Sequence, residues 1–287
     1  MSKIVHFNIG GVPEHFNLPW QIALERGLFK ENFISVKWHE YPGGTGAMTK
    51  DLRNNKLDVA VLLTEGIVAD IINGNPCKII SQYVSSPLIW GIHVPADSGF
   101  QNIEDIKGKR YAISRPGSGS HLMAFVDAQQ RGWSIEEDQL VIVGNMEGAR
   151  KAFKDNDAEI FLWEKFMTKP LVDSGEFSRI GECPTPWPCF VIAAREEIIE
   201  KNPLALKKLI EVISDASVAF MKNPKAAELA ALKFNLILED AVQWHKNTKW
   251  QCGDPLSKDD FERVVDDLFL LNFIEKKPSY ESVCITI

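Results

Sequence analysis

Short apolar runs alternate with helix-forming stretches twice along this chain, and that alternation restricts the folds open to it. Runs rich in β-branched and aromatic residues alternate with amphipathic stretches over residues 4–73, and the same order returns over residues 110–172. Such alternation is typical of parallel sheets covered by helices. After Ala194 the sequence is almost purely helical. The sequence therefore predicts an α/β fold with two mainly parallel sheets, flanking helices and a helical C-terminal segment.

Individual elements follow from the same periodicity. Two helices of the C-terminal segment are predicted to start at Asn202-Pro203 and Asn223-Pro224, where an N-cap residue precedes proline, and a last one at Ser257. The expected strands are 4–9, 34–41, 59–63, 110–113, 140–143 and 159–162. The expected helices between them are 18–27, 45–54, 66–73, 118–131, 147–154 and 163–172.

Two apolar extended stretches, 88–94 and 190–194, bracket the middle series of elements. The chain is therefore predicted to leave a first lobe once and to return to it once, through two crossovers that form a hinge. We expect a discontinuous lobe I made of residues 1–94 and 194–287, and an inserted lobe II made of residues 95–193. A chain of 287 residues is long enough to build two cores.

Composition excludes several classes of partner. The formal charge is −7, and no run of basic residues is long enough to follow a phosphate backbone, so nucleic acid is not an expected partner. The five cysteines are scattered without a Cys-x-x-Cys pair, which suits free thiols in a reducing compartment. No apolar stretch is long enough to span a bilayer and no leader is recognised. We expect a cytoplasmic monomer without a membrane partner.

Two similar glycine-rich loops follow a strand and open a helix, one in each expected lobe. Glycines let the backbone approach a ligand, and the free N–H groups of a helix N-terminus favour an anion or a carbonyl oxygen. The alternative is that both loops are ordinary turns with helix caps. Because the pair occurs in both lobes, we favour a ligand site. Its expected residues are Gly44, Thr45 and Gly46, and Ser118, Gly119, Ser120 and His121.

Other strand ends carry polar and aromatic side chains that would complete such a site. Glu65 and Glu164 follow buried strands, where a charge is costly unless it meets a partner, so one of them is expected to face a cationic or hydrogen-bond-donating group. The alternative is a carboxylate that stabilises a helix start. The tryptophans offer flat surfaces for a ligand or simply pack in the core. These candidates are Glu14, Asn17, Thr64, Glu65, Tyr83, Trp163, Glu164 and Trp187.

Signals for catalysis are weak. The six histidines lack metal-binding spacing, and neither Ser118 nor Ser120 lies in a Gly-x-Ser-x-Gly motif. No cysteine has a recognisable base beside it in the sequence. We therefore expect no catalytic residue, no metal and no cofactor.

Several stretches together resemble the type II periplasmic-binding-protein fold: 22–29, 34–36, 43–45, 52–60, 105–110 and 149–159. The resemblance is to the branch with sulfonate and thiamine-precursor binding proteins, especially its cytosolic orphan members. It implies two lobes that close like a Venus flytrap on a ligand held in the cleft between them. It points to the two glycine-rich loops and to Thr64 and Glu65. The cysteine cluster of the yeast pyrimidine-synthesis enzymes of this branch is missing, so their self-consuming, pyridoxal-phosphate-dependent chemistry is not expected.

The function predicted from the sequence is non-catalytic binding of a small polar organic ligand between the lobes. Two alternatives stay open. One is an enzyme on the same fold, such as a lyase or synthase of thiamine or menaquinone synthesis, with Glu65, His121 or Glu164 as the acid or base. The other is a sensor whose ligand-bound form is recognised by another protein. Whether a transporter or signalling partner exists is left open.

Overall fold

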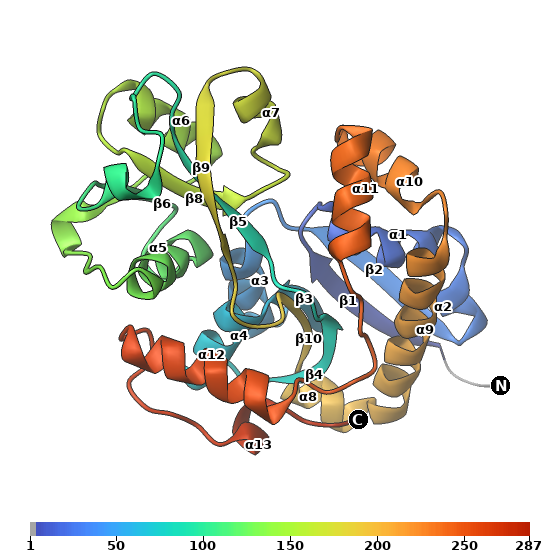
Figure 1. Cartoon of the computed structure of the whole chain (residues 1–287). Helices are drawn as coiled ribbons and strands as arrows, with labels where there is room; N and C mark the ends of the chain where they lie inside the picture. The colour runs from blue at the N-terminus through green and yellow to red at the C-terminus, as the bar shows by residue number, and fades with distance from the viewer. Residues whose placement is uncertain (1–3) are drawn as a thin grey trace. The chain divides into compact units, whose positions relative to one another are not determined.

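The computed structural model describes residues 4–287, which form two compact units (Figure 1). The first unit consists of the residues up to Ser86 together with Trp187–Ile287, and the second consists of Pro87–Pro186. The chain thus leaves the first unit once and returns once. Each unit contains its own five-stranded sheet.

The sheet of the first unit has the strand order β2-β1-β3-β10-β4. Strand β1 pairs in parallel with β2 and β3, whereas β10 is antiparallel to β3 and β4. Four of the five strands therefore run in the same direction, and their carboxyl ends share one edge with the amino end of β10. The strands are β1 (Val5–Gly11), β2 (Ile34–Glu40), β3 (Val59–Leu63), β4 (Cys77–Val84) and β10 (Phe190–Arg195).

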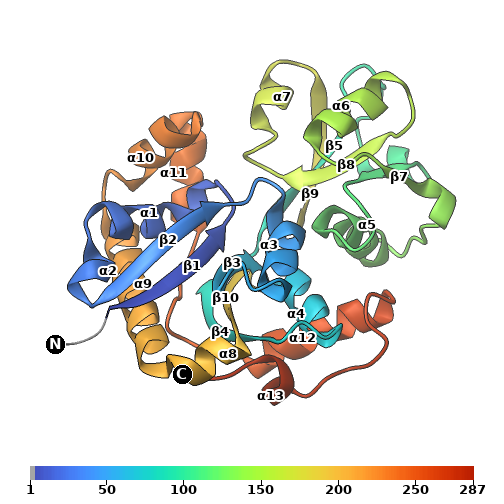
Figure 2. The same cartoon turned by 180° about the vertical axis from the view of Figure 1, so that it is seen from behind.

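Helices cover both faces of this sheet (Figures 1 and 2). Right-handed crossovers put α1 on the face opposite to α3 and α4, because the chain moves from β1 to β2 in one direction and from β2 to β3 and β4 in the other. Helix α9 packs on α1, and α12 packs on α4. The first four helices are α1 (Leu18–Glu25), α2 (Leu28–Glu31), α3 (Gly44–Arg53) and α4 (Thr64–Ile72). The C-terminal helices are α8 (Glu196–Lys201), α9 (Pro203–Lys222), α10 (Ala226–Phe234), α11 (Leu238–Asn247), α12 (Lys258–Leu270) and α13 (Tyr280–Val283).

The start signals predicted for the C-terminal helices are confirmed at two of three places. Helix α9 begins at Pro203, and α12 begins after Ser257, whose side chain accepts a hydrogen bond from the backbone N–H of Asp260. The third signal was placed too early. Asn223 accepts from the N–H of Lys225 in the preceding turn, and α10 starts only at Ala226.

The sheet of the second unit repeats the design of the first, with the order β7-β6-β8-β5-β9. Strand β6 is parallel to β7 and β8, and β5 is antiparallel to β8 and β9. The strands are β5 (Ile89–Pro95), β6 (Tyr111–Ile113), β7 (Leu140–Ile142), β8 (Ile160–Glu164) and β9 (Phe177–Pro184). The helices are α5 (Gly119–Gln130), α6 (Met146–Lys154) and α7 (Lys169–Asp173). Short 3-10 turns lie at His15–Asn17, Ile103–Ile106 and Glu137–Gln139.

The predicted fold class is confirmed, with finer differences. Each sheet is mixed, because one strand opposes the other four. The helix expected over 163–172 is shorter, since β8 continues to Glu164 and α7 starts at Lys169. The expected limits of the lobes also differ. Strand β5 pairs in the second sheet, so residues 89–94 are not part of the first unit, and β10 pairs in the first sheet, so residues 190–193 are not part of the second. Hydrogen bonding with strands distant in sequence decides both assignments.

A buried ion pair lies in the first sheet at the amino end of β3, between Asp58 and Arg195. Asp58 and Arg195 are only 9% and 7% exposed. One carboxylate oxygen of Asp58 accepts from Arg195 at 2.9 Å, and the other accepts from the backbone N–H of Asn8 at 2.8 Å. Arg195 also donates to the carbonyl of Leu57 at 2.9 Å. These charges are thus satisfied within the unit, as buried charges must be for stability.

Within residues 4–287, no helix combines the length and the apolar character that crossing a bilayer requires.

The burial of the five cysteines predicts that their thiols are unreactive in the native protein. All five are buried and free, and burial raises the pKa of the thiols of Cys77, Cys183, Cys252 and Cys284 to about 12. Because only the thiolate attacks a disulfide reagent, we expect almost no reaction of the native protein with dithionitrobenzoate at pH 8. Five thiols should react after unfolding in urea, as measured by absorbance. Fast reaction of several thiols in the native protein would contradict this packing.

Candidate functional site

Four predicted residues of the first unit meet where β3 ends and α4 begins. The backbone N–H of Leu63 donates to Thr45 Oγ1 at 3.1 Å, which ties the glycine-rich loop before α3 to the end of β3. Thr64 Oγ1 donates to the carbonyl of Pro188 at 2.6 Å. Trp187 precedes that proline, and its indole bonds to Glu65. We call Thr45, Thr64, Glu65 and Trp187 the strand-edge cluster.

The start of α3 packs closely against the start of α4. Gly66 follows Glu65 in α4, and a Cβ atom at this position would lie 2.6 Å from Thr45 Cγ2. Thr45 has little freedom to move aside, because its hydroxyl accepts the hydrogen bond from Leu63. Gly44 has a φ of +66° at the start of α3, a conformation that favours glycine.

Glu65 is the most unusual residue of the cluster. It is 2% exposed, and the Nε1–H of Trp187 donates to Oε2 at 2.9 Å. Its other carboxylate oxygen, Oε1, is buried and has no hydrogen-bond partner within the described chain. Burial raises the pKa of Glu65 to about 7, although its own backbone N–H and the Trp187 indole favour the ionised form. A carboxyl group near half-ionisation at neutral pH is therefore enclosed with one oxygen unsatisfied.

Glu14 and Asn17 lie in the segment after β1, whose carboxyl end is at the same sheet edge as that of β3. Asn17 is 4% exposed, and its Nδ2 donates to the carbonyl of Val12 at 2.8 Å. Its Oδ1 has no partner in the part of the chain that the structure describes. Glu14 is half-buried, and burial raises its pKa to about 7. Both residues thus offer acceptor groups at this edge.

Tyr83, another predicted site residue, is buried inside the first unit. Its ring is fully buried beside Trp20, with 6.4 Å between ring centroids. Its hydroxyl donates to the backbone carbonyl of Phe16 at 2.9 Å. In this structure Tyr83 therefore packs inside the first unit, and its role in binding stays a prediction.

In the second unit, the serine loop before α5 forms a closed hydrogen-bond network. Ser118 caps α5 and accepts from the N–H of His121 at 3.3 Å. Ser120 Oγ accepts from the N–H of Ser114 at 2.9 Å and lies 3.1 Å from Ser118 Oγ. The N–H of Gly117 donates to His121 Nδ1 at 3.1 Å, and burial lowers the pKa of this histidine. These side chains hold the loop and, with Gly119, present a helix N-terminus.

Trp163 and Glu164 lie at the carboxyl end of β8, which is parallel to β6. Trp163 stacks on Phe161 with 5.2 Å between ring centroids. Glu164 is buried, and its Oε2 accepts from the backbone N–H groups of Phe166 and Met167 at 3.0 and 2.7 Å. The structural alternative for Glu164, a carboxylate that stabilises the following turn, is thus realised.

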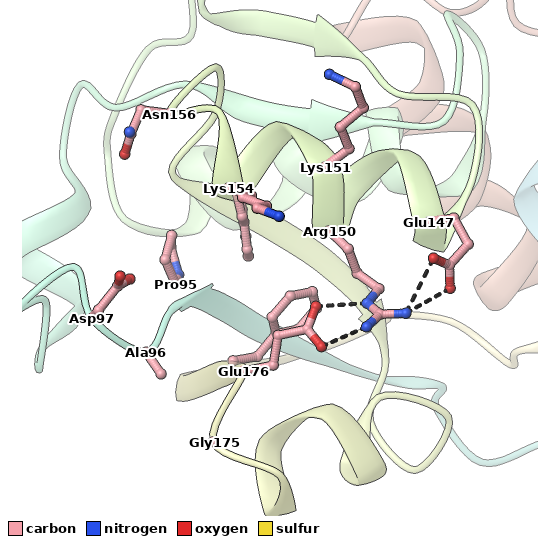
Figure 3. Close-up of a pocket in the computed structure, with 12 residues that line it drawn as sticks. Pro95, Ala96, Asp97, Glu147, Arg150, Lys151, Lys154, Asn156, Gly175 and Glu176 are labelled. Atoms are coloured by element: carbon pink, nitrogen blue, oxygen red, sulfur yellow. Dashed lines mark hydrogen bonds and ion pairs between the residues drawn. The ribbon is translucent and has the colours of Figure 1, made fainter.

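A separate cavity of about 780 Å³ in the second unit contains none of the predicted site residues (Figure 3). It lies between α6, the end of β5 and the start of β9. Its central group, Arg150, bonds to both Glu147 and Glu176, at 2.9 and 2.6 Å. This guanidinium is therefore already paired with two carboxylates.

Comparison with known proteins places the fold. A sequence model described as Ca3427-like periplasmic binding proteins matches residues 90–183, all within the second unit. The structure of the CA3427 gene product of Candida albicans, described as defining a new family with the generic periplasmic-binding-protein fold, matches with a TM-score of 0.90. Its identity is 26%, and the match covers 100% of this chain and 97% of that one. The chain has the periplasmic-binding-protein fold, which confirms the resemblance seen in the sequence.

Other relatives carry names that refer to sulfonates. The alkanesulfonate-binding protein SsuA of Xanthomonas axonopodis pv. citri, solved with bound MOPS, matches with a TM-score of 0.79 at 16% identity, over 99% of both chains. A Bacillus subtilis (strain 168) protein named as a candidate aliphatic sulfonates-binding protein is 25% identical over 206 residues, which is 70% of this chain. The alignment spans 61% of that relative, less than two thirds of its length.

The raised pKa of Glu65 predicts a specific pH dependence of stability. Between pH 4.5 and 7 the folded chain keeps a proton on Glu65 that the unfolded chain releases, so this group lowers the free energy of unfolding as the pH rises. Glu65→Gln retains an acceptor for Trp187 and has no charge. The free energy of unfolding of the variant minus that of the wild type should therefore rise by about 3 kcal/mol from pH 4 to pH 8, as measured by urea unfolding.

The matched control for this prediction is Glu239→Gln, since Glu239 lies in the first turn of α11 and is exposed. It should show no such gain. Equal behaviour of the two variants at both pH values would contradict a raised pKa for Glu65.

Close packing at Gly66 predicts that alanine at this position destabilises the protein, although alanine usually stabilises a helix. Glycine to alanine inside a helix normally stabilises by about 1 kcal/mol. Gly66→Ala should instead destabilise by roughly 1–3 kcal/mol, because the added Cβ meets Thr45 Cγ2. The double variant Thr45→Ser, Gly66→Ala keeps the hydroxyl, lacks Cγ2 and should recover most of the loss in urea unfolding. No recovery would contradict a contact between Thr45 in α3 and Gly66 in α4.

Proposed function

We propose that this chain binds a small polar organic molecule at the carboxyl ends of its parallel strands. The observation that carries the proposal is the buried Glu65, whose Oε1 lacks a partner in the described chain. An unsatisfied buried carboxylate oxygen lowers stability, and a bound ligand that donates to it would remove that cost. Asn17 Oδ1 adds a second acceptor of the same kind.

The local architecture supports this site. In open α/β sheets, ligands collect beyond the carboxyl ends of strands, where helix N-termini present free N–H groups. Helices α3, α4 and α5 each begin directly after a strand of the parallel set. Their N-termini would take an anionic or carbonyl group, and a carboxylate would face a donor on the ligand.

Relatives support a binding role of this general type. The protein solved with MOPS and the Bacillus subtilis relative are both named for sulfonate binding. In our proposal, contacts with the ligand shift an equilibrium between open and closed states of the protein. Since Glu65 and Trp187 are each 2% exposed, a ligand reaches them only when neighbouring segments move.

An enzyme on the same fold is the second candidate, and the raised pKa of Glu65 is the observation that favours it. A carboxyl group with a pKa of about 7 suits proton transfer near neutral pH. The side chain of Glu65 is hydrogen-bonded to an indole N–H, however, and an indole does not exchange a proton in such a role. We therefore favour binding. A sensor role, a transporter or signalling partner, the monomeric state and the cytoplasmic location remain predictions; one relative is described as periplasmic.

The experiment is native mass spectrometry of the freshly purified protein, followed by calorimetry with any retained compound and with amines, amino acids, sulfonates, pyrimidines and carboxylates. We expect one saturable ligand that is recovered intact after unfolding. Thr45→Ala with Ser118→Ala should weaken binding by about tenfold or more, the equivalent of one or two lost hydrogen bonds.

Ser257→Ala is the control, because it removes a helix cap comparable to that of Ser118 at a place outside the proposed site. It should leave the affinity unchanged. A ligand converted during incubation would instead favour the enzyme, and failure of every compound to bind would contradict the proposal.

A further inference from the structure

The two candidate acids differ in what their oxygens already bind. Glu164 Oε2 accepts two backbone N–H groups, at 3.0 and 2.7 Å, so its carboxylate is used in the turn after β8. Glu65 accepts one indole N–H through Oε2 and leaves Oε1 without a partner in the described residues. Glu65 is therefore the acid with capacity left for a ligand.

The segments that follow β1, β2 and β3 and the segment that precedes β10 contain no positively charged lysine or arginine. The stretches 12–17, 41–46, 64–66 and 187–189 contain Glu14 and Glu65 but no lysine or arginine. His15 does not provide the charge either, because it is fully buried and burial lowers its pKa to about 3. The unsatisfied side-chain oxygen of Asn17, which follows β1 at the same sheet edge, is also an acceptor. The Glu65 carboxylate and these acceptor oxygens would repel an anion, whereas they would attract a cation that donates hydrogen bonds.

We propose that Glu65 recognises a positively charged nitrogen group, so that the ligand of the proposed site is an organic ammonium or amidinium compound. This inference rests on the proposed function and specifies its ligand class. Trp187 holds Oε2 in place, and Oε1 accepts an N–H from the ligand. In a buried site such a charge-assisted hydrogen bond is stronger than a neutral one, and the carboxylate becomes fully paired.

This selectivity differs from what the names of the relatives indicate. A ligand with only a sulfonate would place a negative charge beside the unpaired carboxylate. A ligand that carries both groups can put its nitrogen at Glu65 and its acid group at a helix N-terminus of the same unit, such as that of α3, which begins at Gly44. The cationic nitrogen is thus the required group, and the acid group is optional.

The test compares matched probes by calorimetry at pH 8 on the full chain. The aliphatic probes are taurine, ethanolamine and isethionate, which carry an ammonium with a sulfonate, an ammonium with a hydroxyl, and a sulfonate with a hydroxyl. The aromatic probes are benzylamine, benzamidine and benzenesulfonate. We expect at least one cationic probe to bind saturably and more tightly than the sulfonate of its own series. Glu65→Gln should lower the affinity for that probe by about tenfold or more, whereas Glu239→Gln should change the affinity less than about twofold.

The outcomes separate the inference from the proposed function. Binding of isethionate or benzenesulfonate at least as tightly as their cationic matches overturns the inference and leaves the binding function standing. Equal affinity of a cationic probe for the wild type and a folded Glu65→Gln variant also overturns it. If no cationic probe binds, the inference fails, and the proposed function then fails with it only if the broader screen and native mass spectrometry also find no ligand.

Discussion

The direction shared by four of the five strands in each sheet determines where the polar groups of this protein gather. Because one strand in each sheet opposes the others, the carboxyl ends of the parallel set lie along a single edge. Each strand end there leads into a loop or a helix N-terminus. The candidate site residues at the strand ends of each unit are therefore brought to one edge of its sheet by topology.

At that edge, Glu65 and Asn17 each keep a buried side-chain oxygen without a hydrogen-bond partner in the described chain. At the other edge of the first sheet, Asp58 and Arg195 use their charges on each other and on the backbone. In the second unit, Arg150 is held by two carboxylates even though it lines a large cavity. Only a buried group with unused capacity points to a partner that is absent, and Glu65 is such a group. Charge complementarity then indicates a cation.

Much of the fold could be predicted from local sequence patterns. The alternation of strands and helices, the helix start at Ser257 and the two glycine-rich loops are encoded by neighbouring residues. The limits of the lobes could not be read in this way. Strands β5 and β10 are apolar runs that fit either sheet, and their assignment depends on pairing with strands far along the chain.

The roles of the candidate site residues show the same limit. Their positions at strand ends were predictable, but their hydrogen bonds were not. Tyr83 bonds to Phe16, 67 residues away, and Glu65 bonds to Trp187, 122 residues away. Periodicity carries no information on such partners, so it could not distinguish Glu65 from Glu164 or identify Tyr83 as a packing residue.

The most direct measurement of the central claim is the indole N–H spectrum of protein labelled with ¹⁵N at its eight tryptophans. The signal of Trp187 is assigned with a Trp187→Phe variant and followed during titration with the tightest-binding amine or amidine. If the ligand binds at Glu65, the Trp187 signal shifts in step with saturation, because its Nε1–H donates to that carboxylate. Saturable binding that leaves the Trp187 signal unchanged would contradict the account.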